Sequence, residues 1–192
     1  MVKLHNRLHN RWTLGMVAGL MLLMALGFAP AQAAEPSNGE AGDEALIPYT
    51  DYAQHFSVSY PQSWSRQQTA GTGVVFTGRD QSVSVEILPL PKQSLEAYAQ
   101  EDSQALLKAA PGFKKLRLFR SSEVKGAYVL SYEWDAGKSG VTEKPLRDRS
   151  DRYYWITKDS RLVVITGSAP IKKFDREQFR DIALSFRVLA KK

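Results

Sequence analysis

Apolar and polar residues alternate along much of the chain with a period of two, which is typical of β-strands that bury one face. The segments 56–61 (FSVSYP) and 82–89 (SVSVEILP) alternate clearly, and a proline ends each of them. Similar patterns predict further strands at 74–76, 116–118, 127–135, 152–157 and 161–166. The last two of these form a predicted hairpin around the turn at 158–160. Trp64 follows the first strand, and we expect it to turn back and cover one edge of the core.

Two segments have helical periodicity instead. The first is predicted to begin at Ser94, whose hydroxyl can cap the free backbone amides, and to end before Pro111. The second begins at Asp175 and carries one apolar stripe, which is formed by Phe179, Ile182, Ala183 and Phe186. Both helices are expected to pack on the strands. Strands in meanders with two separated helices predict an α+β fold, in which a largely antiparallel sheet is flanked by helices, and not a doubly wound parallel fold.

The first 33 residues have the organisation of a secretory signal peptide. Three basic residues precede an uncharged run, 13–29, which is shorter than a comfortable membrane span of about 20 residues. The small residues of Ala31-Gln32-Ala33 predict cleavage before Ala34. In the alternative interpretation, the uncharged run stays uncut as a single-span anchor. The basic residues hold the N-terminus in the cytoplasm in both cases, so the domain is expected in the periplasm, the thylakoid lumen or outside the cell.

Composition limits what the exported part can be. The 159 residues that follow the signal peptide suit a single domain. The chain has no cysteine, which excludes disulfides, thiolate nucleophiles and the acylated cysteine of bacterial lipoproteins. Residues 34–48 are acidic and poor in apolar side chains, and we expect them to form a disordered spacer ahead of a domain at 49–192. From Asp51 onward the chain has 23 basic and 16 acidic residues, so the folded part is basic.

Catalytic motifs are not evident in the sequence. His55 is the one histidine that follows the predicted signal peptide, and no serine lies in a Gly-x-Ser-x-Gly elbow. Asp51 lies four residues before His55, but two such residues are a weak metal signal. Gly71-Thr-Gly73 precedes a predicted strand, whereas a phosphate cradle needs the N-terminus of a helix. We therefore predict a non-enzyme without catalytic, metal-binding or cofactor-binding residues.

The most unusual local chemistry is a basic segment that leads into three aromatic residues. Its cations are Lys144, Arg147, Arg149 and Arg152. Guanidinium groups on a loop suit carboxylates, phosphates or an acidic protein face, so we predict that these four residues form a partner-binding loop. In the alternative interpretation they are solvated edge residues that pair with Asp148 and Asp151. The expected partner is an acidic protein surface or an anionic membrane surface; nucleic acid is excluded by export.

Several motifs in order resemble the PsbP-like proteins, which comprise the photosystem II extrinsic subunit and its bacterial relatives within the Mog1, PsbP and DcrB-like fold. The motifs are Tyr49-Thr-Asp-Tyr52, FSVSYP at 56–61 with Trp64, GVVF at 73–76, VSV at 83–85, DRYY at 151–154 and the final Ser185-Phe186. The resemblance implies an antiparallel sheet sandwiched between helices.

The resemblance also implies an exported accessory or assembly protein, and not an enzyme. We therefore expect a monomer that docks on a membrane-bound or cell-envelope complex, associated with photosystem II if the host is photosynthetic. The alternative is an extracytoplasmic ligand-binding or cargo-carrying module that uses the concave side of the sheet.

Overall fold

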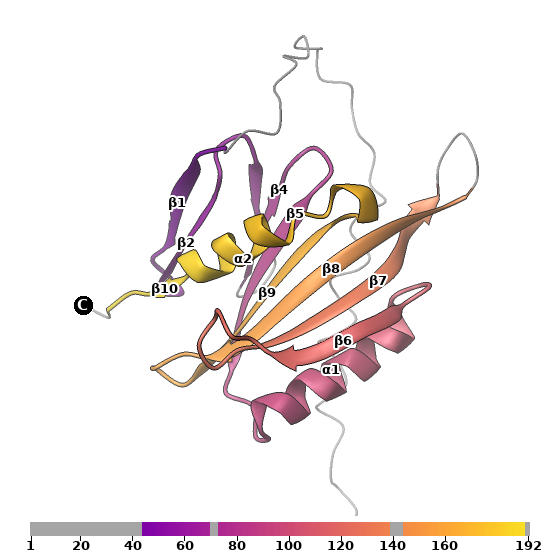
Figure 1. Cartoon of the computed structure of the whole chain (residues 1–192). Helices are drawn as coiled ribbons and strands as arrows, with labels where there is room; N and C mark the ends of the chain where they lie inside the picture. The colour runs from indigo at the N-terminus through magenta and orange to yellow at the C-terminus, as the bar shows by residue number, and fades with distance from the viewer. Residues whose placement is uncertain (1–43, 70–72, 139–143, 191–192) are drawn as a thin grey trace, which may run out of the picture. The chain divides into compact units, whose positions relative to one another are not determined.

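The computed structural model describes residues 44–69, 73–138 and 144–190 (Figure 1). Within these segments the chain forms ten strands, two α-helices and one 3₁₀ helix, η1. In chain order the elements are β1 (Leu46–Asp51), β2 (Phe56–Pro61), β3 (Ser65–Gln68), β4 (Gly73–Thr77), β5 (Ser82–Pro89), α1 (Leu95–Ala109), β6 (Lys114–Arg120), β7 (Tyr128–Lys138), β8 (Pro145–Ile156), β9 (Arg161–Pro170), η1 (Ile171–Lys173), α2 (Arg176–Ser185) and β10 (Arg187–Val188).

The described strands form two antiparallel sheets. The larger sheet has seven strands in the order β3-β4-β5-β9-β8-β7-β6, and the smaller has three in the order β1-β2-β10. β9 lies in the middle of the larger sheet and is buried along most of its length. The predicted α+β class with an antiparallel sheet is confirmed.

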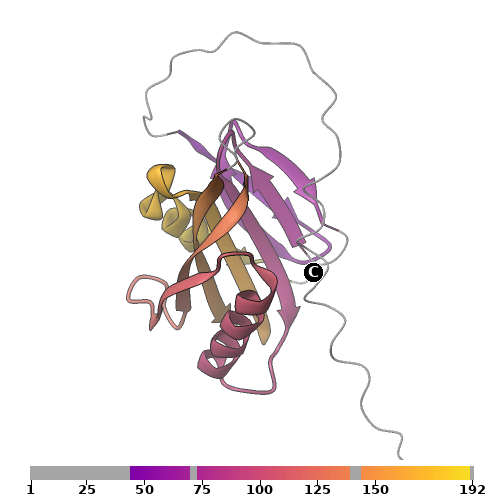
Figure 2. The same cartoon turned by 90° about the vertical axis from the view of Figure 1, so that its right-hand side faces the viewer.

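The two α-helices cover opposite faces of the large sheet (Figure 2). α1 packs against β6, β7 and β8, whereas α2 packs against β2 and β8. The predicted N-cap of α1 is present, because the Ser94 hydroxyl accepts a hydrogen bond from the amide of Ala97. Asp175, at which the second helix was expected to begin, caps α2, and its carboxylate accepts hydrogen bonds from the amides of Glu177 and Gln178. These caps fix where each helix begins.

Each face of the large sheet has its own apolar core. The core on the α2 side contains Phe56, Phe76, Val83, Val85, Ile165, Phe179 and Ile182. The core on the α1 side contains Ala99, Leu106, Leu130, Tyr154 and Val164. Gly167 of β9 permits the close approach of α2, because a Cβ at this position would collide with the Phe179 ring. α2 is thereby held close to the sheet.

Five strands precede α1, whereas the sequence predicted three. The unpredicted β3 consists of four exposed polar residues. It lies at the edge of the large sheet, where a strand need not contribute apolar side chains to the core. The unpredicted β1 is also an edge strand and therefore tolerates Pro48. Because β1 begins at Leu46, the last three residues assigned to the acidic spacer belong to the folded domain. Residues 34–43 lie outside the described part of the chain.

Candidate functional site

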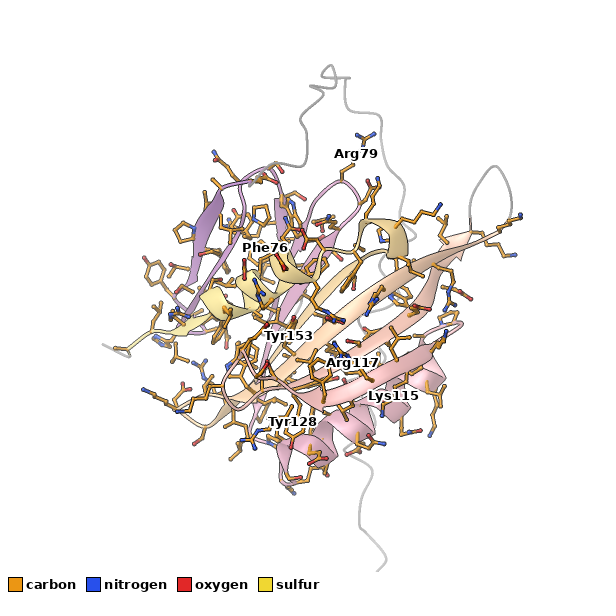
Figure 3. The ribbon with its side chains drawn as sticks, in the orientation of Figure 1. Phe76, Arg79, Lys115, Arg117, Tyr128 and Tyr153 are labelled. Atoms are coloured by element: carbon orange, nitrogen blue, oxygen red, sulfur yellow. The ribbon has the colours of Figure 1, made fainter. Side chains whose placement is uncertain are left out.

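A cleft of about 280 Å³ opens on the α2 side of the large sheet. It lies between the first residue of α2 and the connection from β6 to β7, and β6, β7 and β8 form its floor. Its lining consists of Arg117, Phe119, Ser121, Ser122, Glu123, Val129, Asp151, Tyr153 and Arg176. Figure 3 shows Arg117 and Tyr153 near each other on this face.

A bulge in β6 brings the lining residues together. The alternation of β6 is interrupted between Lys115 and Arg117. The register then places Arg117 opposite Ser131, and Ser131 opposite Asp151. Residues directly opposite in antiparallel strands share a face of the sheet. The neighbouring row on that face consists of Phe119, Val129 and Tyr153.

The carboxylate of Asp151 lies at the base of the cleft with only 1% of the residue exposed. It accepts a hydrogen bond of 2.6 Å from the Ser131 hydroxyl and one of 2.9 Å from Arg176 Nε. The second contact is also an ion pair, so the buried charge is compensated. Asp151 therefore holds the Arg176 guanidinium at the cleft, while Arg176 Nη2 is buried without a hydrogen-bond partner.

Tyr153 is 4% exposed, yet no other described residue forms a hydrogen bond with its hydroxyl. The ring packs in the α2-side core and the residue lines the cleft. Burial, reinforced by the nearby Asp151 carboxylate, raises the pKa of Tyr153. The phenol is therefore protonated at neutral pH and is an available donor.

Arg117 is exposed, and its guanidinium carbon lies 4.1 Å from the centre of the Phe119 ring. Among the described residues, no carboxylate forms an ion pair with it. Glu123, the other acidic residue of the lining, pairs at 3.7 Å with Arg180. No local sequence pattern indicates this site, because its residues meet only through the register of the sheet.

The four cations predicted to form a binding loop are not gathered on a loop. Arg147, Arg149 and Arg152 lie in β8, and Lys144 is exposed immediately before it. The loop prediction was wrong because residues 147–151 carry polar side chains on both faces of the strand, so the expected strand began only at residue 152. Arg147 and Arg149 share the α2 side of the sheet, whereas Arg152 belongs to the α1 side.

Each of the three arginines has its own surroundings, and the expected pairs with Asp148 and Asp151 are not the contacts that they make. Arg147 Nη1 forms an ion pair of 2.5 Å with Asp135 and donates a hydrogen bond to the carbonyl of Gly112. The guanidinium of Arg149 lies 5.1 Å from the centre of the Phe174 ring. Arg152 is part of a buried charge cluster with α1. The structure brings Arg147 and Arg149 together and separates Arg152 from them.

Asp51 and His55 do not form a joint site. The Asp51 carboxylate accepts hydrogen bonds from the amide of Gln54 and from the side chains of Tyr49 and Gln68. Burial alone would raise the pKa of Asp51, but these hydrogen bonds lower it. In the described residues no group of three or more histidine, cysteine or acidic side chains is arranged to hold a metal ion.

The described helices are all too short or too polar to cross a bilayer. The uncharged run at 13–29 lies outside the described residues.

Comparisons with known proteins identify one matching family model and several structures of similar fold. The family model described as PsbP matches residues 44–188. Among solved structures, cyanobacterial PsbP (CyanoP) from Synechocystis sp. PCC 6803 is similar with a TM-score of 0.56 and 19% identity, over 80% of this chain and 98% of that chain. The Ran-binding protein Mog1p of Saccharomyces cerevisiae has a TM-score of 0.53 and 14% identity, over 76% of this chain and 96% of that chain. A search of curated proteins gives no match.

Proposed function

Since this chain belongs to the PsbP family, we propose that it is an exported, non-catalytic accessory or assembly protein that docks on a membrane-bound complex. The observation that carries the proposal is the family match over residues 44–188, which spans nearly all of the described fold. The similarity to cyanobacterial PsbP supports photosystem II as the complex if the host is photosynthetic. Mog1p shares the fold, which alone does not fix a partner.

The proposed docking surface is a basic corner formed by Lys144, Arg147, Arg149, Lys172 and Lys173. The first three residues belong to β8 and its start, and the lysines belong to η1. η1 packs against β8, and Arg149 lies over Phe174 at the end of η1. Arg152, predicted from sequence as a fourth member, is left out because strand parity places it on the opposite face of the sheet, beside Asp102. Within the corner Arg147 pairs with Asp135 and Lys173 with Asp80, so Lys144, Arg149 and Lys172 are its cations without a carboxylate partner among the described residues.

We expect charge reversal at this corner to weaken binding to host membranes. Arg149→Glu/Lys172→Glu removes two cations that have no carboxylate partner among the described residues. Each cation contributes about 1 kcal/mol toward an anionic surface, so the pair should cost at least about 30-fold in affinity. Binding is measured by co-sedimentation of the purified protein with host membranes at low ionic strength and at 0.15 M salt, where the Debye length is about 8 Å.

The control is Lys92→Glu/Lys108→Glu, which changes the net charge equally but places both changes beside or on α1. Membranes stripped of surface protein by protease distinguish an acidic protein partner from anionic lipid. Equal loss in both double variants would reduce the effect to net charge and contradict a docking corner.

Export itself gives a separate expectation. Protein isolated from outside the cytoplasm should begin at Ala34, because Ala31 and Ala33 occupy the positions that a signal peptidase inspects. Intact-mass measurement and N-terminal sequencing test this directly. A membrane-retained product that begins at Met1 would establish the uncleaved anchor instead.

A further inference from the structure

The cleft beside α2 collects hydrogen-bond donors that the fold leaves unused. The Tyr153 hydroxyl and Arg176 Nη2 have no hydrogen-bond partner in the described chain, although both residues line the cleft. Arg117 of β6 adds a guanidinium to the lining. A buried donor normally finds a partner, so the unpartnered Arg176 Nη2, with the two other unused donors of the same cleft, indicates a ligand that accepts hydrogen bonds.

The charges in and around the cleft set the charge of this ligand. Asp151 is compensated by Arg176, and Glu123 pairs with Arg180. Two cations line the cleft, and of these Arg176 is paired with Asp151 whereas Arg117 has no carboxylate partner among the described residues. A ligand with one negative charge balances Arg117, whereas a dianionic phosphate would add a second charge close to buried Asp151.

The rest of the lining is suited to an apolar group. The Phe119 and Tyr153 rings and Val129 form one row across the floor, and the Ser121 and Ser122 hydroxyls border it. The volume of about 280 Å³ is just below the range of about 300–1,000 Å³ that is usual for ligand pockets, so the ligand must be small. The cleft has room for one carboxylate and an attached side-chain-sized body.

We propose that this cleft binds a carboxylate carried by an aromatic or apolar body, with the carboxylate at Arg117 and the Tyr153 hydroxyl and the body against Phe119 and Val129. Such a group is present at a peptide C-terminus and in a free aryl acid. The cleft shares no residue with the basic corner, so this inference stands or fails independently of the proposed docking.

The test uses N-acetylphenylalanine as a peptide-terminus probe, 3-phenylpropionate as a free-acid probe and N-acetylphenylalanine amide as the uncharged analogue. Titrations are followed by NMR of the backbone amides and arginine Nε–Hε groups of the full-length protein. Both acids should shift the Arg117 and Arg176 signals, and the amide should leave them in place. The acid with the higher affinity identifies the source of the ligand.

Tyr153→Phe separates binding from folding, because the lost hydroxyl has no partner in the described fold. This variant should keep its melting temperature and bind about tenfold more weakly, as expected for the loss of a hydrogen bond to a charged group. Arg117→Gln should abolish binding. Tyr154→Phe is the matched control: its hydroxyl donates to Asp102 on the other face, so the melting temperature should fall and binding should stay unchanged.

Three results would overturn the proposal. One is equal shifts with the acids and the amide, which would show that the charge is not recognised. Another is tighter binding of phenyl phosphate than of either acid, which contradicts the charge balance. The third is unchanged affinity in folded Tyr153→Phe and Arg117→Gln, which would show that the acid binds at another site.

Discussion

Replacement of Trp64 by alanine is expected to lower the free energy of unfolding by about 3–5 kcal/mol. The residue is 8% exposed and belongs to the α2-side core, as its position after β2 predicted. Its indole lies against Gly78 so closely that a Cβ there would come within 2.7 Å of Trp64 Nε1. Loss of the indole therefore leaves a cavity lined by atoms that cannot all move in. Urea unfolding at constant m-value measures the loss.

The contact with Gly78 supplies an internal check. Gly78→Ala alone should destabilise the protein because its methyl group overlaps the indole, and the same substitution should cost much less in Trp64→Ala. Tyr52→Ala is the matched control, since Tyr52 is 80% exposed and its loss should change stability by less than about 0.5 kcal/mol. An unchanged stability of Trp64→Ala would place the indole on the surface and contradict the contact.

The parts of the fold that were predictable from sequence are those with local signals. The hairpin of β8 and β9 was expected from two alternating segments around a turn, and the structure pairs them directly, with Trp155 opposite Val163. α1 and α2 were expected from a capping residue and an apolar stripe, both of which are present. Each of these signals lies within about a dozen residues, so it is readable without knowledge of the tertiary contacts.

The strands that the sequence did not predict lack an alternation of apolar and polar side chains. β3 reads SRQQ, with no apolar side chain, because an edge strand need not contribute to a core. The first part of β8 carries polar residues on both faces, so it shows no alternation of apolar and polar residues that would predict a strand. The first part of β8 is recognised as a strand only through its pairing with β7.

The candidate sites also depend on strand pairing, which has no local signal in the sequence. Grouping Arg147, Arg149 and Arg152 by proximity in sequence ignored strand parity, which sends Arg152 to the opposite face. The cleft, in contrast, joins Arg117, Tyr153 and Arg176 from distant segments. A bulge in β6 and the register of β6, β7 and β8 place them together, and neither feature has a local sequence signal.

The separated Arg152 is expected to be one of the residues on which stability depends most. Its Nε lies 2.9 Å from Asp102 Oδ2 as an ion pair, and its Nη1 donates to Thr166 at 2.9 Å and to Glu86 at 3.4 Å. The Tyr154 hydroxyl donates to the same Asp102 oxygen at 2.6 Å. Burial alone would lower the pKa of Arg152, but the surrounding acidic groups raise it well above its ordinary value. A group whose pKa rises on folding stabilises the fold at every pH below its unfolded value, so this contribution is fully present at neutral pH.

Arg152→Met should therefore lower the free energy of unfolding by about 3–5 kcal/mol at pH 7, because it leaves the Asp102 carboxylate buried without its cation. The triple variant Arg152→Met/Asp102→Leu/Glu86→Met should regain most of that loss, since apolar residues of similar volume replace a buried charge cluster at little cost. Urea unfolding of the three proteins measures both effects, and Lys108→Met, an exposed change on α1, serves as control. If the single variant matched the wild type in stability, the Arg152 charge would be solvated rather than paired, and Arg152 would again be available for docking.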